Sequence, residues 1–175
     1  MTIRIEKSKD FDATENIIKE AFTGLPFSDQ KEHELVKRLR ESPEFIPSLS
    51  LVYEVDEKIV GHILLTKLKI NDDKQSFEAL ALAPVSVKPS YQRKGIGKEM
   101  IHKSLEMARE SGFKAVVVMG HEHYYPKFGF EPASKWNIKA PFEVPDETFM
   151  VKELQMGSLK GIQGVVEYSP AFGLQ

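Results

Sequence analysis

Gly95 and Gly97 lie at the start of a helical pattern and directly after an apolar run. Glycine has no Cβ atom and lets the backbone come close to a ligand. The first turn of a helix carries N–H groups without intrahelical acceptors, and the helix dipole favours an anion beside them. Three positive side chains accompany this turn: Arg93, Lys94 and Lys98. Residues 92–98 are therefore a candidate site for the phosphates of a nucleotide-type cofactor.

The charge of the chain is concentrated at the same turn. Its net charge is −2, but residues 88–103 hold five Lys/Arg against one Glu, and residues 10–57 hold twelve Asp/Glu against five Lys/Arg. A solvated basic helix face would give the same local excess, so the charge alone does not establish a site. The overall balance gives no reason to expect a nucleic acid or a membrane as a partner.

A second group of chemically capable side chains follows about thirty residues later, in Gly120-His-Glu-His-Tyr-Tyr-Pro-Lys-Phe-Gly-Phe130. Tyrosine can donate a proton, and histidine is a natural base near neutral pH. Tyr125 has the alternative of a core aromatic whose hydroxyl bonds to the backbone. His121 and His123 are candidates for a base or for the wall of an acceptor pocket. Their spacing also suits a metal, but no third ligand is evident, so we predict no metal site.

The elements that position these two segments follow from the apolar periodicity. Alternation predicts a strand at residues 2–6 and three further strands that form an antiparallel meander, at residues 49–55, 59–70 and 77–87. Helical spacing predicts helices behind the capping-box pattern at residues 12–15, over 30–40 and over 97–110. The apolar run 113–119 completes a strand–helix–strand unit, with the glycine turn at the carboxyl end of its first strand, where open α/β sheets bind ligands.

Pro84 interrupts the long strand 77–87. Proline cannot donate to a strand ladder, so it implies an edge, a bulge or a harmless kink. The strand is too apolar for a simple solvent edge, and we therefore favour a bulge that splays the strand from its neighbour. The resulting gap would hold an extended ligand through main-chain hydrogen bonds.

The bulk composition fits one soluble domain over residues 1–175, with a core at 1–154 and a C-terminal strand and tail at 155–175. Apolar residues make up 41% and charged residues 29% of the chain, and cysteine is absent. The lack of cysteine fits a reducing compartment. The N-terminus has no apolar segment that predicts export. We expect a cytoplasmic protein.

With these residues in place, the sequence resembles the GNAT N-acetyltransferase superfamily. Val87-Lys-Pro-Ser-Tyr-Gln-Arg-Lys-Gly-Ile-Gly97 looks like the acetyl-CoA pyrophosphate loop of that family, and Tyr124-Tyr-Pro-Lys-Phe-Gly-Phe130 looks like its Tyr-x-x-x-Gly-Phe segment. The ending, Phe149-Met-Val followed by Gly157 and by Tyr168-Ser-Pro-Ala-Phe172, resembles a bacterial subfamily of unassigned acceptor. The fold that this resemblance implies is α/β (α+β): a mostly antiparallel twisted sheet of six to seven strands, with helices on both faces and a splayed central strand pair.

The resemblance also implies roles for individual residues. Backbone N–H groups of 93–98 would bind the CoA pyrophosphate, the backbone of Val85 to Val87 would pair with the pantetheine arm, and an N–H near Val87 would polarise the thioester carbonyl. Tyr125, four residues before Gly129, matches the tyrosine that protonates the departing thiolate, whereas Tyr124 does not match that spacing. The implied cofactor-binding residues are Val85, Ser86, Val87, Gln92, Arg93, Lys94, Gly95, Ile96, Gly97 and Lys98.

The general base and the acceptor pocket are less defined. Glu78 begins the bulged strand and is a candidate base, because several GNAT enzymes use a carboxylate on that strand; the alternative is an exposed glutamate at a strand end. Trp136 is a candidate for the acceptor pocket, with ordinary core packing as its alternative. The acidic balance of residues 10–57 favours a cationic acceptor only weakly, since acidic helix surfaces also serve solubility.

The leading hypothesis is an acetyl-CoA-dependent N-acetyltransferase that acts on a small-molecule or peptide amine. A non-catalytic acyl-CoA-binding or sensor domain is the alternative, since it would keep residues 92–98 and need no Tyr125. A dinucleotide or nucleoside triphosphate site is disfavoured, because the chain has neither a Gly-x-Gly-x-x-Gly pattern nor a Gly-Lys-Ser/Thr loop. The tail strands could also mediate a homodimer.

Overall fold

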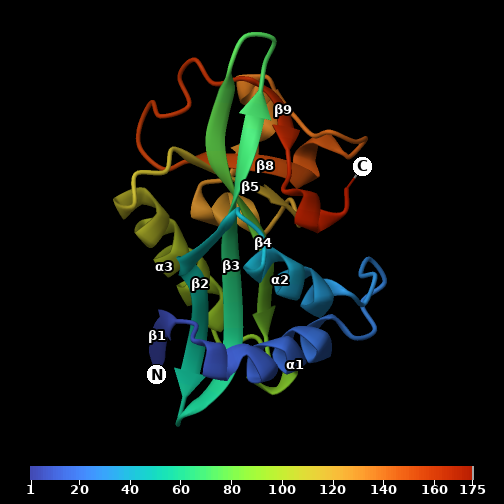
Figure 1. The fold of residues 1–175 in the computed structure, drawn as a ribbon, viewed down its shortest axis with the longest axis vertical. Helices are drawn as coiled ribbons and strands as arrows, with labels where there is room; N and C mark the ends of the chain where they lie inside the picture. Colours follow the sequence, from blue (N-terminus) through green and yellow to red (C-terminus); the bar gives the residue numbers. More distant parts are fainter. Residues whose placement is uncertain (175) are drawn as a thin grey trace.

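The computed structural model describes residues 1–174, which build one mixed sheet with helices on both of its faces (Figure 1). The helices are α1 (Phe11–Phe22), α2 (Glu32–Arg40) and α3 (Ile96–Glu110). The strands are β1 (Thr2–Ile5), β2 (Phe45–Val55), β3 (Lys58–Asn71), β4 (Ser76–Val87), β5 (Ala115–Met119), β6 (Glu131–Pro132), β7 (Ile138–Lys139), β8 (Phe149–Glu153) and β9 (Gly164–Glu167). The main path runs β1-β2-β3-β4-β5-β8-β6, and β9 joins β3 and β7.

The predicted meander is confirmed, and so is the bulge at Pro84. Strands β2, β3 and β4 pair antiparallel in sequence order. The register changes between Ile63↔Val85 and Leu65↔Leu82, so that Ala83 and Pro84 of β4 oppose a single residue of β3. This two-against-one arrangement defines a β-bulge, which bends the strand that carries it.

The splayed strand pair lies between β4 and β5. These two strands are parallel, and their register contains only Leu80↔Val116 and Ala81↔Val117. Beyond Ala81 the remaining six residues of β4 continue to Val87 without a partner on this side. The bulge therefore turns β4 away from β5 and opens the gap that the sequence predicts.

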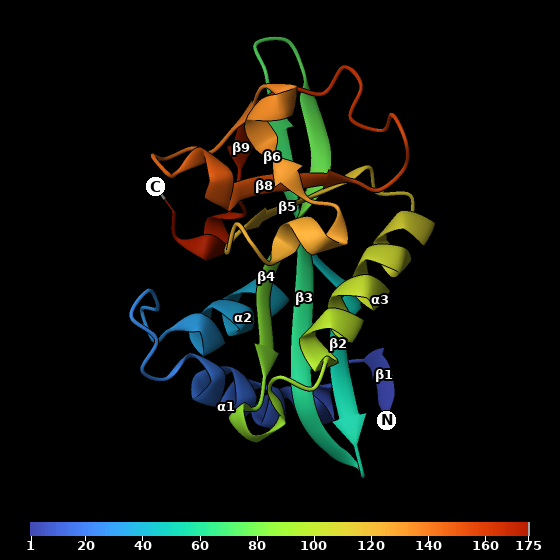
Figure 2. The ribbon, with the colours of Figure 1, turned by 180° about the vertical axis from the view of Figure 1, so that it is seen from behind.

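Alternating apolar residues assign the two faces of the sheet. Leu80 and Leu82 of β4 and Val116 of β5 face α3, whose buried side chains include Met100 and Ile101. On the other face, Leu64 of β3 packs with Ile18 of α1 and with Val36 and Leu39 of α2. Figures 1 and 2 show α1 and α2 on one side of the sheet and α3 on the other. The layers are those expected from the sequence.

The C-terminal segment is built into the same sheet. Leu159, Ile162 and Val166 are buried in the core cluster that covers the upper part of β3 and β4. β9 pairs with β3 at Lys69↔Glu167, Ile70↔Val166 and Asn71↔Val165. The guanidinium of Arg38 on α2 also donates to the carbonyl of Ala171, at 2.9 Å. The segment therefore completes a part of the core to which β7 and β8 also contribute.

Some boundaries differ from the expected ones. β2 begins at Phe45, so it includes Pro47, and a register shift between Phe45 and Ser50 accommodates the proline. α1 begins at Phe11, which places Asp12 in its first turn and not at a cap. Residues 1–174 form nine strands, more than the expected six to seven, partly because β6 and β7 have two residues each, too few for a periodic signal. Within residues 1–174, no helix is long and apolar enough to cross a membrane.

A buried polar cluster joins the sheet to the N-terminal helices. The imidazole of His62 on β3 is fully buried, with Nε2 3.1 Å from the Ser50 hydroxyl and 3.7 Å from a Glu6 carboxylate oxygen. Arg40 of α2 donates to both Glu6, at 2.8 Å, and Glu15, at 2.9 Å. Burial lowers the pKa of His62 to about 4, although the Glu6 carboxylate opposes that shift and Arg40 adds to it.

Acidification is expected to destabilise the fold through His62. The unfolded chain binds a proton on this histidine below its ordinary pKa of about 6.5, while the folded chain does so only near pH 4. Stability should therefore fall as the pH drops from about 6.5 to 4, by up to roughly 3 kcal/mol at about 1.4 kcal/mol per pKa unit. Urea unfolding at pH 7 and pH 5 measures this loss. The variant His62→Gln should lose less stability over the same interval, and an equal loss in both proteins would contradict the assignment.

Candidate functional site

Strand β4 presents main-chain groups to the gap beside β5. In an antiparallel pair, residues alternate between those bonded to the partner and those whose amide and carbonyl point away from it. The amide of Lys88 donates to the carbonyl of Val60 at 2.8 Å, which sets this alternation. Ser86 consequently bonds to β3, while the main-chain groups of Val85 and Val87 point toward the gap. The side chain of Ser86 is buried and does not reach the gap.

The turn after β4 is held by local contacts and by positive φ angles. The side-chain amide of Gln92 donates to the Val87 carbonyl at 3.0 Å, so Gln92 fixes the turn against the strand. Arg93 and Gly95 have φ of 64° and 84°, in the left-handed region that favours glycine. Ile96 is buried against the core and anchors the start of α3.

The turn leaves six consecutive amides without a protein acceptor. The first backbone amide of α3 that donates is that of Glu99, to Gly95. Within the described residues, no hydrogen bond takes the N–H groups of residues 93–98. The exposed side chains of Arg93, Lys94 and Lys98 add positive charge to this helix N-terminus. Donors and positive charge without an acceptor make a site for an anionic group.

Tyr125 lies on the same face of the sheet as α3, at the start of the 3₁₀ helix η3 (Tyr125–Phe128). Its ring contacts Phe130 edge to face at 5.7 Å and lies against Gly120, which follows β5. The hydroxyl makes no hydrogen bond among residues 1–174, yet it is not fully enclosed, unlike the Ser86 hydroxyl. Burial raises the pKa of Tyr125 to about 12, and the neighbouring Tyr124 adds to the shift. The phenol therefore keeps its proton at neutral pH.

Tyr124 also belongs to the site, although the sequence pattern assigned it no role. A Cβ atom placed on Gly97 would lie 3.4 Å from the Tyr124 hydroxyl and 3.8 Å from Cγ2 of Val87. The end of β4, the first turn of α3 and the segment before η3 thus meet at Gly97. The spacing to Gly129 matches Tyr125 alone and assigns nothing to Tyr124, so the contact of Tyr124 with Gly97 emerges only from the fold.

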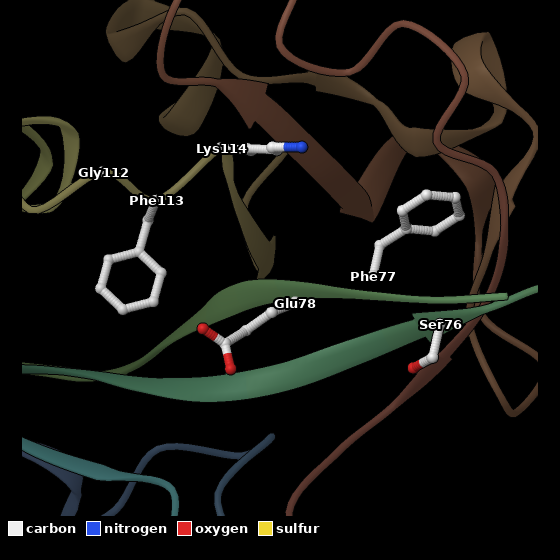
Figure 3. A pocket seen from close by; sticks show the side chains of 6 residues that line it. All are labelled: Ser76, Phe77, Glu78, Gly112, Phe113 and Lys114. Carbon is white, nitrogen blue, oxygen red and sulfur yellow. The ribbon is translucent and has the colours of Figure 1, made fainter.

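Glu78 lies apart from these residues. Its side chain is 58% exposed, with Lys67 4.0 Å away. It borders a cavity of about 300 Å³ between the starts of β4 and β5, lined by Ser76, Phe77, Glu78, Gly112, Phe113 and Lys114. In Figure 3 the Glu78 carboxylate and the Phe113 ring point toward the same opening, and the Lys114 ammonium points away from them. The paired residues Leu80 and Ala81 separate Glu78 from the gap at Val85, so the geometry does not favour it as the base.

Of the other predicted pocket residues, His121 is in contact with the tyrosine segment, whereas His123 is exposed and Trp136 packs elsewhere in the core. The ring of His121 lies 5.7 Å from that of Phe27, an exposed residue of the loop between α1 and α2. Its carbonyl also accepts the amides of Tyr124 and Tyr125, so His121 borders the tyrosine segment. The side chain of His123 is 92% exposed and contacts only Glu122 among the described charged groups. Trp136 packs with the core cluster on the opposite face of the sheet from Tyr125.

Comparison with known proteins identifies acetyltransferases of similar sequence and fold. A family profile described as an acetyltransferase (GNAT) domain matches residues 2–133. The uncharacterized N-acetyltransferase YjhQ of Escherichia coli K12 is 39% identical over 122 residues, which cover 69% of this chain and 67% of that protein.

Two solved structures are similar over nearly the whole chain. The crystal structure of the GNAT family N-acetyltransferase YhbS from Escherichia coli, in complex with CoA, has a TM-score of 0.88 and 25% identity over 99% of this chain and 92% of that one. A GNAT family acetyltransferase from Brucella melitensis, in complex with acetyl-CoA, has a TM-score of 0.80 and 30% identity over 98% of this chain and 97% of that one.

Proposed function

The chain belongs to the GNAT N-acetyltransferase superfamily, and we propose that it moves the acetyl group of acetyl-CoA to a primary amine by direct attack on the thioester. The observation that carries this proposal is the row of free amides at residues 93–98, which lies at the end of the gap beside β4. Two similar structures were solved as complexes with CoA or acetyl-CoA, which supports the same cosubstrate here.

The cofactor would lie along β4 and end at the turn. The amides of residues 93–98 bind its pyrophosphate, and Arg93, Lys94 and Lys98 supply compensating charge. The pantetheine arm pairs with the main chain of Val85 and Val87 like an added strand. Since Val87 adjoins the turn, the thioester at the far end of the arm is nearer to Val85, and we assign the carbonyl donor to the Val85 N–H in place of Val87. One such donor contributes roughly 3–4 kcal/mol to transition-state stabilisation.

The reaction needs a neutral amine and a protonated leaving group. The amine nitrogen attacks the carbonyl carbon, the carbon–sulfur bond breaks, and the thiolate takes the proton of the Tyr125 hydroxyl. The amine loses its own proton to a base. A free amine with a pKa near 10 is only about 0.1% neutral at pH 7, so this deprotonation is a real requirement. We keep Glu78 as a predicted base to be tested, although its location does not support the role.

We propose that the acceptor is a small-molecule or peptide amine that enters near Phe27 and His121. Phe27 is 67% exposed, and its contact with His121 bridges the loop between α1 and α2 to the end of β5. The acidic excess in residues 10–57 favours an acceptor that arrives as a cation. Trp136 and His123 are not among the residues that this entrance brings together.

Thiol release from acetyl-CoA across a panel of amines tests the proposed reaction. We expect release that depends on both the amine and acetyl-CoA, with an acetylated amine as the product. Binding of acetyl-CoA without release for any amine in the panel would favour the acyl-CoA-binding or sensor alternative.

The variant His121→Ala tests the proposed entrance for the acceptor. It should raise the KM for the amine and leave the KM for acetyl-CoA unchanged.

Gly97→Ala should separate cofactor binding from stability. The added methyl lies at ordinary contact distances of 3.4 and 3.8 Å from Tyr124 and Val87, so the fold accepts it. Replacing glycine inside a helix stabilises the fold by about 0.4–1 kcal/mol. The methyl nevertheless occupies the space through which the cofactor approaches the protein backbone at Gly97. We therefore expect about a tenfold loss of CoA affinity. Calorimetry and thermal melting measure the two effects, and unchanged CoA affinity would contradict the placement.

A further inference from the structure

The Tyr124 hydroxyl occupies the junction between the gap and the glycine turn. It lies 3.4 Å from the Cβ position of Gly97, and Cγ2 of Val87 lies 3.8 Å from the same position. Cβ atoms on a helix tilt toward its N-terminus, so the hydroxyl flanks the first turn of α3 on the side of β4. A ligand that extends from the gap to the free amides has to pass this hydroxyl.

Aromatic contacts hold the Tyr124 ring in this place. Its centroid is 5.2 Å from the centroids of both Tyr125 and Phe128, with interplanar angles of 79° and 70°. Phe128 in turn contacts His102 of α3 edge to face at 5.0 Å. These edge-to-face contacts leave the phenol oxygen directed at the helix start and fix it before a ligand arrives.

Within residues 1–174, the Tyr124 hydroxyl lacks a hydrogen-bond partner, as do the amides beside it. Tyr124 is half-buried, and its hydroxyl makes no hydrogen bond to any other described residue. In the adjacent turn, the backbone N–H groups of residues 93–98 have no acceptor among the described residues. A ligand that satisfies them must offer several acceptor oxygens, and a phenol can donate to such an oxygen as well. Burial raises the pKa of Tyr124 above its usual value, so the donor proton is present at neutral pH.

We propose that Tyr124 is a cofactor-binding residue whose hydroxyl donates a hydrogen bond to a pyrophosphate oxygen of CoA. This assignment rests on the proposed function, because it adds a contact within the same site. It separates the two adjacent tyrosines by role: Tyr124 binds the phosphates, and Tyr125 serves the thiolate. The sequence spacing distinguished only the second role.

The variant Tyr124→Phe tests the assignment, because it keeps the ring contacts and removes only the hydroxyl. Calorimetry with CoA and with adenosine 3′-phosphate 5′-diphosphate, which keeps the pyrophosphate and lacks the pantetheine arm, locates the contact. A hydrogen bond to a charged oxygen corresponds to about tenfold or more in affinity. We expect Tyr124→Phe to weaken both ligands by a similar factor. Tyr125→Phe and the distant Tyr168→Phe should weaken neither, and all three variants should melt as the wild type does.

Each other outcome overturns a distinct claim. Unchanged affinity of Tyr124→Phe for CoA would remove the hydroxyl from the site while the proposed function stands. Weaker binding of CoA with unchanged binding of the diphosphate would move the contact to the pantetheine arm and contradict the pyrophosphate assignment. Failure of the wild-type protein to bind CoA would overturn the proposed function and, with it, this inference.

Discussion

Replacing Tyr125 by phenylalanine is expected to lower kcat for acetyl transfer by about 10²–10⁴-fold, the range that a general acid contributes. The variant keeps the ring that packs against Phe130 and Gly120. It removes only the proton that the leaving thiolate takes, so the affinity for CoA should not change. Single-turnover thiol release with saturating acetyl-CoA measures the chemical step separately from binding.

The pH dependence of kcat gives an independent check on Tyr125. Burial, together with Tyr124, raises the pKa of Tyr125 to about 12. The acid form is therefore fully populated across pH 6–10, and Tyr125 should add no falling limb to the kcat profile below about pH 11. The distant variant Tyr168→Phe is the control for loss of a tyrosine hydroxyl. A rate in Tyr125→Phe equal to that of the wild type or of this control would exclude Tyr125 from the mechanism.

Removing residues 155–175 is expected to unfold the protein. The segment buries Leu159, Ile162 and Val166, which are 1%, 5% and 1% exposed. Burial of side chains of this kind contributes roughly 1.5–3 kcal/mol each, so their combined loss approaches the whole stability of a typical domain, about 5–15 kcal/mol. The deletion would also remove β9, the strand that pairs with Lys69, Ile70 and Asn71 of β3. Circular dichroism should show that cooperative melting is lost, and gel filtration should show that the truncated chain aggregates.

A matched pair of point variants keeps this prediction testable when the truncated chain is insoluble. Val166 is 1% exposed and its neighbour Val165 is 44% exposed. Val166→Ala should lower the free energy of unfolding by roughly 1–3 kcal/mol, while Val165→Ala should change it little. Equal effects of the two variants would contradict the packing of β9. We propose on this basis that residues 1–175 fold as one unit and that the segment after residue 154 is part of its core.

The strongly periodic parts of the chain were predictable because their apolar spacing repeats over many residues. The meander of β2, β3 and β4 and the helix α3 are of this kind. Pro84 predicted the bulge for a different reason: a proline in an apolar strand leaves few alternatives. The turn at residues 92–98 was predictable because glycine spacing, basic charge and a helix start coincide there.

What the sequence could not supply were contacts between segments that lack a periodic signal. The position of Tyr124 beside Gly97 depends on how η3 packs against α3. The Phe27–His121 contact joins two loops whose residues carry no shared pattern. Glu78, the candidate base, lies away from the gap because the β4–β5 pairs at Leu80 and Ala81 separate the two. This strand register is a property of the folded sheet that the sequence pattern does not give.

Backbone amide resonances of the wild-type protein, followed during titration with acetyl-CoA, test directly whether the turn at residues 92–98 binds the cofactor. We expect saturable shifts of the amides of residues 93–98, since acquiring a phosphate acceptor changes the environment of each free N–H. The amides of Val85 and Val87 should shift with them, and those of the distant β9 should not. An absence of saturable shifts at residues 93–98 with high micromolar acetyl-CoA would show that this turn does not bind the cofactor.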